Sequence, residues 1–544
     1  MAEQAASDLV QFRSTSRPTS QELVQASSSG ELFFAVVGHV GSGTSEVATT
    51  LRRVLSSASS DSGPAYDAIV IKASAELEDW DAQNKQKLRS EHRGLEKTEI
   101  LQQIGNDMRR SDPAAVARAL IRKIRTTRAE KTGVDLTETG PVLPDGRRRA
   151  YILDSIRHPA EVELLTRIYQ DAFVLVSVVC DATIRLSRLK DEKFTDSGRD
   201  QIEAFMERDA KEGPKYGQRV SDAFHLAHYF LDNTEDRKDN DDNPNPEWNL
   251  SEQLVRLKKI LTHATVVRPY SSETAMFAAY GAKVRSACLS RQVGASIVNN
   301  GGEVISLGTN EVPQAGGGVY GAGDIDVSPI DDGRCVHKNR FCSNTHEQEA
   351  IIKKVIKSLR DNKIVGDHIA SVSDEILEVT LEKSPIGSLL EFSRAVHAEM
   401  DAVLSLVRRG MSAMGTRVFV STFPCHYCAR HLVAAGVSEV QFIEPYPKSK
   451  ALDLHSDSIT TRFSEWRESR ERERREKTGK KIKVLFRPFV GVAPRLYSRA
   501  FTKTRDLKDG TGAFIVGRQE WTGPTHLGHS SYTELEAQLA RAES

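Results

Sequence analysis

The sequence is poor in cysteine, with six in 544 residues, which excludes a disulfide-rich secreted scaffold. No window approaches the roughly 18 apolar residues that a membrane-spanning helix needs. Residues 1–30 lack the basic stretch followed by an apolar stretch that marks a secretory signal. From these absences we predict a soluble, cytoplasmic protein with no membrane partner. Clustered cysteines in such a protein are metal ligands or inert core residues rather than disulfides.

An excess of either charge is also absent. Lys+Arg and Asp+Glu both number 75, so the formal net charge is zero. A dedicated nucleic-acid binder usually carries a basic excess, so this balance disfavours that class without excluding a local basic patch. Apolar residues, in contrast, make up 39% of the chain, which is enough for a buried core. The length predicts about three to four domains, or two large ones.

Two α/β patterns divide the chain. Through residues 31–262, short apolar runs alternate with helical segments, which predicts a parallel sheet with helices on both faces. Residues 263–500 hold a second pattern, with a β-hairpin and two amphipathic helices that each end at a glycine. We expect residues 1–30, rich in Ser, Gln and Ala, to be a flexible leader. Residues 501–544 are assigned to a C-terminal tail without a readable function.

Two short motifs in the second pattern predict a zinc site. His397-Ala-Glu399 precedes Pro424-Cys425-His-Tyr-Cys428, and each motif opens a predicted helix. This is the H-x-E and P-C-x-x-C signature of zinc-dependent nucleotide deaminases. His397, Cys425 and Cys428 supply three ligands and leave the fourth tetrahedral position of Zn²⁺ open for water, whose pKa the metal lowers to about 7. Glu399 is then the expected proton carrier between that water, the ring nitrogen and the leaving ammonia.

Two other interpretations of these motifs stay open. One is a closed structural zinc site, which needs a fourth protein ligand. His426 and His431 are near in sequence, but neither has the spacing of such a ligand in the deaminase pattern. The other is a degenerate deaminase that has kept its metal without its activity.

At these motifs the chain resembles the cytidine and deoxycytidylate deaminase superfamily, over residues 270–460 or thereabouts. The resemblance implies a three-layer α/β/α fold, with a mixed sheet and both zinc-bearing helices on one face. It also implies that Asn310 hydrogen-bonds the hydroxyl of a deoxyribose. The family carries Tyr and Gly where this chain has Thr309 and Glu311, so the shape of the sugar pocket differs. The alternative for Asn310 is a turn residue that tolerates left-handed backbone angles.

The resemblance extends to further residues of the pocket. Tyr446 lies where related enzymes place an aromatic ring beside the base, although a surface tyrosine between two prolines is the alternative. Arg285 and Arg291 flank the hairpin and are candidates for contact with a 5′-phosphate. Cys288 and Cys335 loosely match the positions of a second, structural zinc in some deoxycytidylate deaminases. The alternative for these two is a pair of buried or free thiols.

The N-terminal domain carries a glycine-rich motif, Gly38-His-Val-Gly41-Ser-Gly43-Thr44-Ser45, between a predicted strand and a predicted helix. That context is the one a phosphate-binding P-loop requires, with backbone N–H groups at a helix N-terminus around the phosphates. Ser45 occupies the position of the Mg²⁺-binding hydroxyl. Thr44 stands where P-loops carry a lysine, so the motif lacks the charge that contacts the β- and γ-phosphates.

The remainder of this domain resembles small P-loop kinases. Residues 153–161 are similar to the strand-end Asp and following Arg/Glu stretch of nucleoside-monophosphate kinases, and residues 181–188 are similar to their lid. We therefore expect a P-loop kinase-like domain that binds ATP or another nucleotide with Mg²⁺ without fast phosphoryl transfer. The alternative is a domain that keeps the fold as an interaction scaffold.

A P-loop domain ahead of a deaminase domain resembles the architecture of bacterial anti-phage dCTP deaminases. The resemblance implies hydrolysis of dCTP to dUTP and of dCMP to dUMP, depletion of the nucleotide pool as antiviral defence, control through the P-loop domain, a regulatory small RNA and a homo-oligomer. Two other functions compete with it. One is a nucleic-acid editor of cytosine or adenine. The other is a nucleotide- or RNA-sensing module in which the deaminase domain is only structural.

Overall fold

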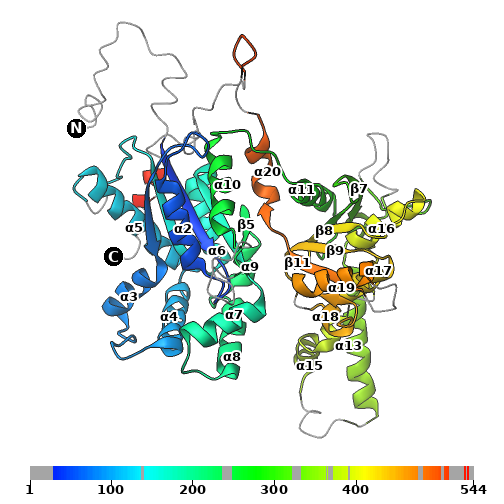
Figure 1. The fold of residues 1–544 in the computed structure, drawn as a ribbon. Helices are drawn as coiled ribbons and strands as arrows, with labels where there is room; N and C mark the ends of the chain where they lie inside the picture. The colour runs from blue at the N-terminus through cyan, green and yellow to red at the C-terminus, as the bar shows by residue number, and fades with distance from the viewer. Residues whose placement is uncertain are drawn as a thin grey trace. The chain divides into compact units, whose positions relative to one another are not determined.

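The computed structural model divides the chain into two compact units (Figure 1). The first unit comprises Met1–Leu226, Asn233–Val267 and Arg505–Ser544, and the second comprises Ala227–Asp232 and Arg268–Thr504. The division at Val267 lies close to the predicted boundary at residue 262. The structure describes residues 29–136, 140–235, 248–321, 332–362, 364, 372–389, 392–446, 448–475, 482–503, 508–513, 532–534 and 536–537.

Parts of the predicted leader and of the predicted tail lie outside the described residues. Residues 1–28 of the predicted leader lie outside the described residues. The predicted tail is described in part, and the division assigns Arg505–Ser544 to the first unit instead of to a segment of its own. Among the described residues, none of the helices combines the length and the apolar character required to cross a bilayer.

The first unit is built on a parallel sheet, as the alternation of strand and helix predicted. Its strands lie in the order β4-β1-β3-β2, and all three neighbouring pairs are parallel. Every residue of β1 and of β4 is buried, which is why these strands read as continuous apolar runs. The strands are β1 (Glu31–Val37), β2 (Asp67–Lys72), β3 (Arg149–Ile156) and β4 (Phe173–Val179).

Helices of the first unit connect these strands and cover the sheet; α2 and α10 pack together (Figure 1). The helices are α2 (Thr44–Ser56), α3 (Ala73–Asn84), α4 (Gly94–Arg109), α5 (Ala115–Thr132), α6 (Pro159–Tyr169), α7 (Ala182–Arg188), α8 (Arg199–Ala210), α9 (Val220–Phe224) and α10 (Leu250–Thr262), with the short turns η1 (Gln170–Ala172) and η2 (Leu189–Lys193). Because these parallel strands all lead into their helices at their carboxyl ends, the loops between strand and helix lie together at that edge of the sheet.

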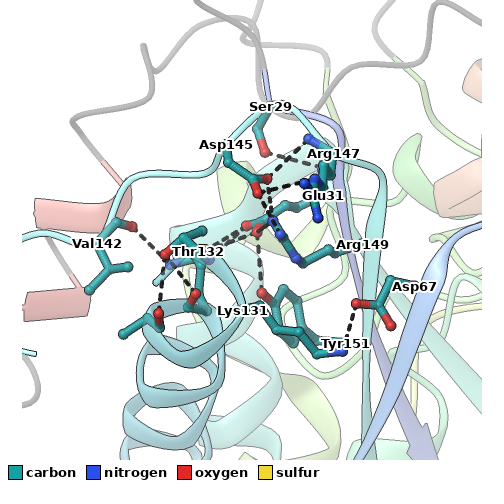
Figure 2. A network of polar contacts seen from close by, with 12 residues as sticks. Ser29, Glu31, Asp67, Lys131, Thr132, Val142, Asp145, Arg147, Arg149 and Tyr151 are labelled. Carbon is teal, nitrogen blue, oxygen red and sulfur yellow. Dashed lines mark hydrogen bonds and ion pairs between the residues drawn. The ribbon is translucent and has the colours of Figure 1, made fainter. Parts of the chain in front are cut away.

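A buried polar network closes the opposite edge of this sheet, around the start of β1. Figure 2 shows Glu31 beside Tyr151, whose hydroxyl donates to the Glu31 carboxylate at 3.2 Å. Arg128 of α5, fully buried, pairs with Glu31 at 2.7 Å and with Glu536 at 2.5 Å. The Tyr169 hydroxyl donates to the same Glu536 at 2.6 Å. Residues from the predicted tail thus belong to the core of the first unit, which nothing in the local sequence of the tail indicated.

The second unit contains a mixed sheet, as the deaminase resemblance implied. Its strand order is β10-β11-β9-β8-β6-β7, in which β6 is antiparallel to both neighbours and the other pairs are parallel. The strands are β6 (Gly294–Val298), β7 (Val304–Thr309), β8 (Arg417–Thr422), β9 (Glu439–Glu444), β10 (Ile459–Thr460) and β11 (Val484–Pro488). The short strands β5 (Tyr229–Asp232) and β12 (Gly491–Val492) pair antiparallel within the same unit.

Helices cover both faces of the second sheet. On β6, the Ser296 hydroxyl donates to the Ala275 carbonyl of α11, whereas the flanking Ala295 and Ile297 belong to one apolar cluster with α16 and α17. Since alternate side chains of a strand point to opposite faces, α11 lies on one face, and α16 and α17 lie on the other. The helices are α11 (Ser271–Val284), α12 (Cys335–Lys338), α13 (Ser343–Asp361), α15 (Asp374–Glu382), η4 (Pro385–Ser388), α16 (Ala398–Arg408), α17 (His426–Ala434), α18 (Ala451–Leu454), α19 (Phe463–Arg475) and α20 (Pro494–Phe501).

One glycine sets how closely α16 approaches the sheet. A Cβ atom at Gly308 of β7 would lie 2.0 Å from the carbonyl oxygen of Ala398, the first residue of α16. A side chain at that position would therefore push the start of the helix away from the strand. Because His397 caps this helix, the glycine also sets the position of the predicted metal ligand.

Candidate functional site

The three predicted zinc ligands come together at the N-termini of α16 and α17. The Nδ1 atom of His397 lies 3.3 Å from the Sγ atom of Cys425 and 3.4 Å from that of Cys428. Their ligand atoms all lie within 4.8 Å of one another, and no other such group of three occurs in the described part of the chain. Tetrahedral zinc with ordinary bond lengths places N and S ligands about 3.6 Å apart, so these side chains fit that metal.

The charge state of the site favours a thiolate. A hydrogen bond from Cys428 lowers the pKa of the Cys425 thiol to about 4, so that Cys425 is ionised at neutral pH. Cys425 is also the N-cap of α17, where the helix dipole favours negative charge. An ionised thiol is the form that binds metal.

Glu399 lies in the first turn of α16 and is 4% exposed. Burial raises the pKa of its carboxyl to about 7. A carboxyl with such a pKa takes up and releases protons near neutral pH, as a general acid–base group must. The side chain lines the same cavity as His397 without being one of the three grouped ligands.

A cavity of about 420 Å³ opens in front of these residues. His397, Glu399 and Cys425 form part of its wall, and Asn310 and Tyr446, the predicted substrate contacts, line it as well. Cys428 is 1% exposed and lies behind the wall. The volume lies within the range that ligand pockets usually have.

Two hydrogen bonds hold Asn310 in place. Its side-chain nitrogen donates to the Arg291 carbonyl at 2.7 Å, and its backbone N–H donates to Val293 at 3.0 Å. Asn310 is not among the described residues with a positive φ, so the alternative of a left-handed turn residue has no support. Its side-chain oxygen has no partner among the described residues and is available to accept a hydrogen bond in the cavity.

The two departures from the family pattern beside Asn310 are both buried. Glu311, 1% exposed, accepts hydrogen bonds from the backbone N–H groups of Ala287 and Val312. Thr309, also 1% exposed, donates through its hydroxyl to the Ala282 carbonyl at 3.1 Å. Both side chains therefore fix the backbone that carries Asn310. This role could not be predicted from the motif, since Ala287 and Ala282 lie more than twenty positions away from it.

The cavity wall also combines an aromatic ring with positive charge. The Arg291 guanidinium lies 5.6 Å from the centroid of the Tyr446 ring, a cation–π distance. Arg291, Arg394 and Lys448 line the cavity, whereas Arg285 does not. The sequence analysis missed Arg394 and Lys448; the nearest signal for Arg394 is its position three residues before His397.

The structure does not assemble a second zinc site from the predicted residues. Cys288 and Cys335 both line the cavity, but neither belongs to a group of three metal-binding side chains within the described ranges. The Sγ atom of Cys335 instead accepts a hydrogen bond from Arg394 at 3.6 Å. The second zinc site and its alternative, a pair of free thiols, both stay predictions.

The glycine-rich motif of the first unit lies between a strand and a helix, as the sequence predicted. β1 ends at Val37 and α2 begins at Thr44, so the loop joins a buried strand to a helix N-terminus. Gly43 has a φ of 83°, and a Cβ there would lie 2.4 Å from the Asn233 side-chain nitrogen. Both the backbone angle and this close approach require glycine.

A second cavity, of about 660 Å³, lies over this loop. Gly41, Gly43, Thr44 and Ser45 line it, whereas Gly38 does not. The Ser45 hydroxyl donates to the Oδ2 atom of Asp154 at 2.7 Å, at the end of β3. A hydroxyl at this loop position beside a strand-end aspartate is the pair that holds Mg²⁺ in P-loop proteins.

Comparison with known proteins bears on the second unit. Residues 269–444 match the family model of the cytidine and deoxycytidylate deaminase zinc-binding region. Deoxycytidylate deaminase of Enterobacteria phage T4 is 27% identical over 183 residues, which cover 33% of this chain and 80% of the phage protein. A solved dCMP deaminase of cyanophage S-TIM5, in complex with dCMP and dUMP, is 18% identical, with a TM-score of 0.20 over 35% of this chain and 93% of that one.

A further relative does not carry the name of a deaminase. A UPF0200/UPF0201 protein of Archaeoglobus fulgidus is 33% identical over 144 residues, which cover 26% of this chain and 38% of that protein. The family model and the phage enzyme together show that the chain carries a C-terminal domain of the cytidine and deoxycytidylate deaminase type, as its zinc motifs predicted. The P-loop kinase-like identity of the first unit stays a prediction.

Proposed function

We propose that the second unit deaminates deoxycytidine nucleotides by zinc-dependent hydrolysis, converting dCMP to dUMP and dCTP to dUTP with release of ammonia. The observation that carries this proposal is the grouping of His397, Cys425 and Cys428 next to the buried Glu399. The names of the relatives that match this domain support dCMP as a substrate. The basic wall of the cavity supports a phosphorylated substrate over a free nucleoside.

Each residue of the site has its own role in the proposed reaction. When bound, zinc would supply a Lewis acid that makes water a nucleophile at neutral pH. Glu399 takes the proton of that water and delivers protons to the ring nitrogen and to the departing amine. Asn310 accepts a hydrogen bond from the sugar hydroxyl, and the ring of Tyr446 stacks on the base, a contact worth roughly 1–3 kcal/mol.

The test is a substrate panel with the purified full chain. We expect ammonia release from dCMP and dCTP, and a lower rate from CMP, CTP and deoxycytidine. A Glu399→Gln variant serves as the matched blank for contaminating deaminases. Deamination of cytosine or adenine in single-stranded DNA or RNA, without turnover of any free nucleotide, would replace this proposal by the nucleic-acid editing function. No turnover of any member of the panel by zinc-loaded protein would leave the domain a structural one.

For the first unit we infer binding of ATP or another nucleotide with Mg²⁺, used to control the deaminase. Ser45 paired to Asp154 under a cavity of nucleotide size supports this inference. Deamination is hydrolytic and consumes no phosphoryl energy, so the first unit has no chemical step to supply. The test is a titration of the full chain with ATP and other nucleoside triphosphates, with and without Mg²⁺.

In the cell, we infer a role in antiviral defence, in which the enzyme depletes the pool of deoxycytidine nucleotides. We further infer that a small RNA controls the protein, and that it acts as a homo-oligomer in the cytoplasm. The support is the pairing of a P-loop sequence with a deaminase domain in one chain, which is an analogy of architecture. Expression of wild type and Glu399→Gln during phage infection tests it. Equal phage yield and equal dCTP levels in both strains would contradict the role.

A further inference from the structure

The loop cavity of the first unit contains positive charge that the loop sequence itself lacks. Thr44 stands at the position where a P-loop lysine would contact the phosphates, and it contributes no charge. Three cationic side chains from outside the loop line the same cavity: Arg157, Arg188 and Lys193. Arg157 follows β3, Arg188 ends α7, and Lys193 ends the η2 turn.

Of these three, Arg157 and Arg188 are held by hydrogen-bonding partners among the described residues, whereas Lys193 is not. Arg157 is paired with the buried Asp209, and Arg188 donates to the backbone carbonyls of Asn233 and Thr234 at 2.8 and 3.0 Å. Lys193 has no ion pair within the part of the chain that the structure describes. Its ammonium lies 5.2 Å from the centroid of the Phe194 ring. Burial and the nearby charge of Arg157 lower the pKa of Lys193, so an anion in the cavity would relieve both effects.

The same cavity also has a place for a cation. Asp154 is 5% exposed, and its Oδ2 atom accepts from Ser45 while its Oδ1 atom is buried without a partner in the described residues. A buried carboxylate oxygen without a partner is costly, and Mg²⁺ with its waters at Ser45 would satisfy it. Glu46 and Glu192 line the cavity too, and their charges favour a magnesium complex over a free polyphosphate.

We propose that Lys193, on the η2 turn, takes the place of the lysine that the P-loop lacks at Thr44, and that the cavity binds the phosphate chain of a magnesium nucleotide between Lys193 and Ser45. This inference rests on the nucleotide binding proposed above and names the residue that makes such binding feasible. Because the cation belongs to the segment from α7 to η2, a bound nucleotide ties that segment to the loop. A loop with its own lysine would not create this link, so the arrangement suits a sensor of nucleotide better than a phosphotransferase.

The test is calorimetric titration of the zinc-loaded full chain with MgATP and with magnesium tripolyphosphate. Loss of a hydrogen bond to a charged group costs about 1.5–3 kcal/mol, so Lys193→Ala should weaken both ligands roughly ten- to a hundredfold. Lys190→Ala is the matched control, because Lys190 is an exposed lysine of the same turn that does not line the cavity. Adding Thr44→Lys to Lys193→Ala should restore the affinity, since it returns the charge to the loop.

The possible results distinguish a failure of the role of Lys193 from a failure of nucleotide binding itself. Wild-type affinity in Lys193→Ala and in Lys193→Gln, with unchanged thermal melts, would overturn the role of Lys193 and leave nucleotide binding intact. Absence of MgATP and tripolyphosphate binding in the wild type would overturn both. Turnover of dCMP, assayed in the same preparations, reports on the deaminase alone, and we expect it to be the same in Lys193→Ala and Lys190→Ala.

Discussion

Each of the two cavities includes a helix N-terminus that follows a strand, α17 after β8 and α2 after β1, yet the cavities obtain their functional groups in different ways. In the second unit, His397, Cys425 and Cys428 all come from two short motifs that open α16 and α17. In the first unit, the loop provides backbone and a hydroxyl, while the cations come from elements far along the chain. A metal needs a fixed number of ligands at fixed distances, whereas a phosphate chain accepts charge from several directions. The loop motif therefore tolerates a loss that the zinc motif would not.

The largest effect expected is from loss of a zinc ligand. Cys425→Ala should lose the bound metal and all detectable deamination, because two ligands cannot hold zinc in an open site. Elemental analysis and dCMP turnover measure the two consequences. Cys180→Ser, in the first unit, is the control and should keep both. A full complement of zinc in a Cys425→Ala, Cys428→Ala double variant would remove these motifs from the metal site.

Glu399→Gln should separate metal binding from chemistry. The variant keeps the size of the side chain and removes no ligand, so zinc content should match the wild type. Turnover should fall roughly 10²- to 10⁴-fold, the usual contribution of a general acid–base group. The exposed Glu303, changed to Gln, is the matched control. Activity above about a tenth of wild type would mean that another group carries the proton.

Asn310→Ala probes substrate recognition in the same cavity. Its side-chain oxygen is the proposed acceptor for the sugar hydroxyl, and loss of one such bond should lower kcat/KM for dCMP roughly ten- to a hundredfold. The decrease should be smaller for a 2′,3′-dideoxy analogue, which lacks that hydroxyl. Equal losses on both substrates would point to a structural role through Arg291 and Val293.

Ser45→Ala should have the smallest effect on deamination and thereby sharpen the contrast between the units. We expect the affinity for ATP to become independent of Mg²⁺, because the hydroxyl beside Asp154 that would hold the ion is gone. Turnover of dCMP should change less than about twofold in the absence of nucleotide, since nothing in the deaminase step uses the loop. A collapse of dCMP turnover in a well-folded Ser45→Ala protein would show that the first unit takes part in the active enzyme.

The sequence predicted features that short stretches of the chain carry. The two motifs that contain His397, Cys425 and Cys428, which the structure brings together, and the strand–loop–helix around Gly43 are of this kind. The alternation of apolar runs likewise predicted the parallel sheet of the first unit. The catalytic role of Glu399 stays a prediction. The motifs lie in short segments beside a helix N-terminus, whereas the sheet was predicted from a periodicity that repeats over a long part of the chain.

Residues that act across the fold were not accessible in the same way. Lys193 and Arg394 look like ordinary exposed cations until the fold places them in a cavity wall. Glu536 sits in a segment without a readable pattern, yet it is fully buried against Arg128. Buried charges of this kind depend on partners hundreds of positions away, and no local periodicity records them.

The burial of Tyr532 and Glu536 in the first unit has a consequence for biosynthesis. Until the ribosome has released these residues, Arg128 has Glu31 but not Glu536 as a partner, and an incompletely paired buried charge is strongly destabilising. The strands and helices of the second unit, by contrast, are all translated before Tyr532. During synthesis we therefore expect the second unit to reach its native state while the first unit still lacks Tyr532 and Glu536, the reverse of their order along the chain.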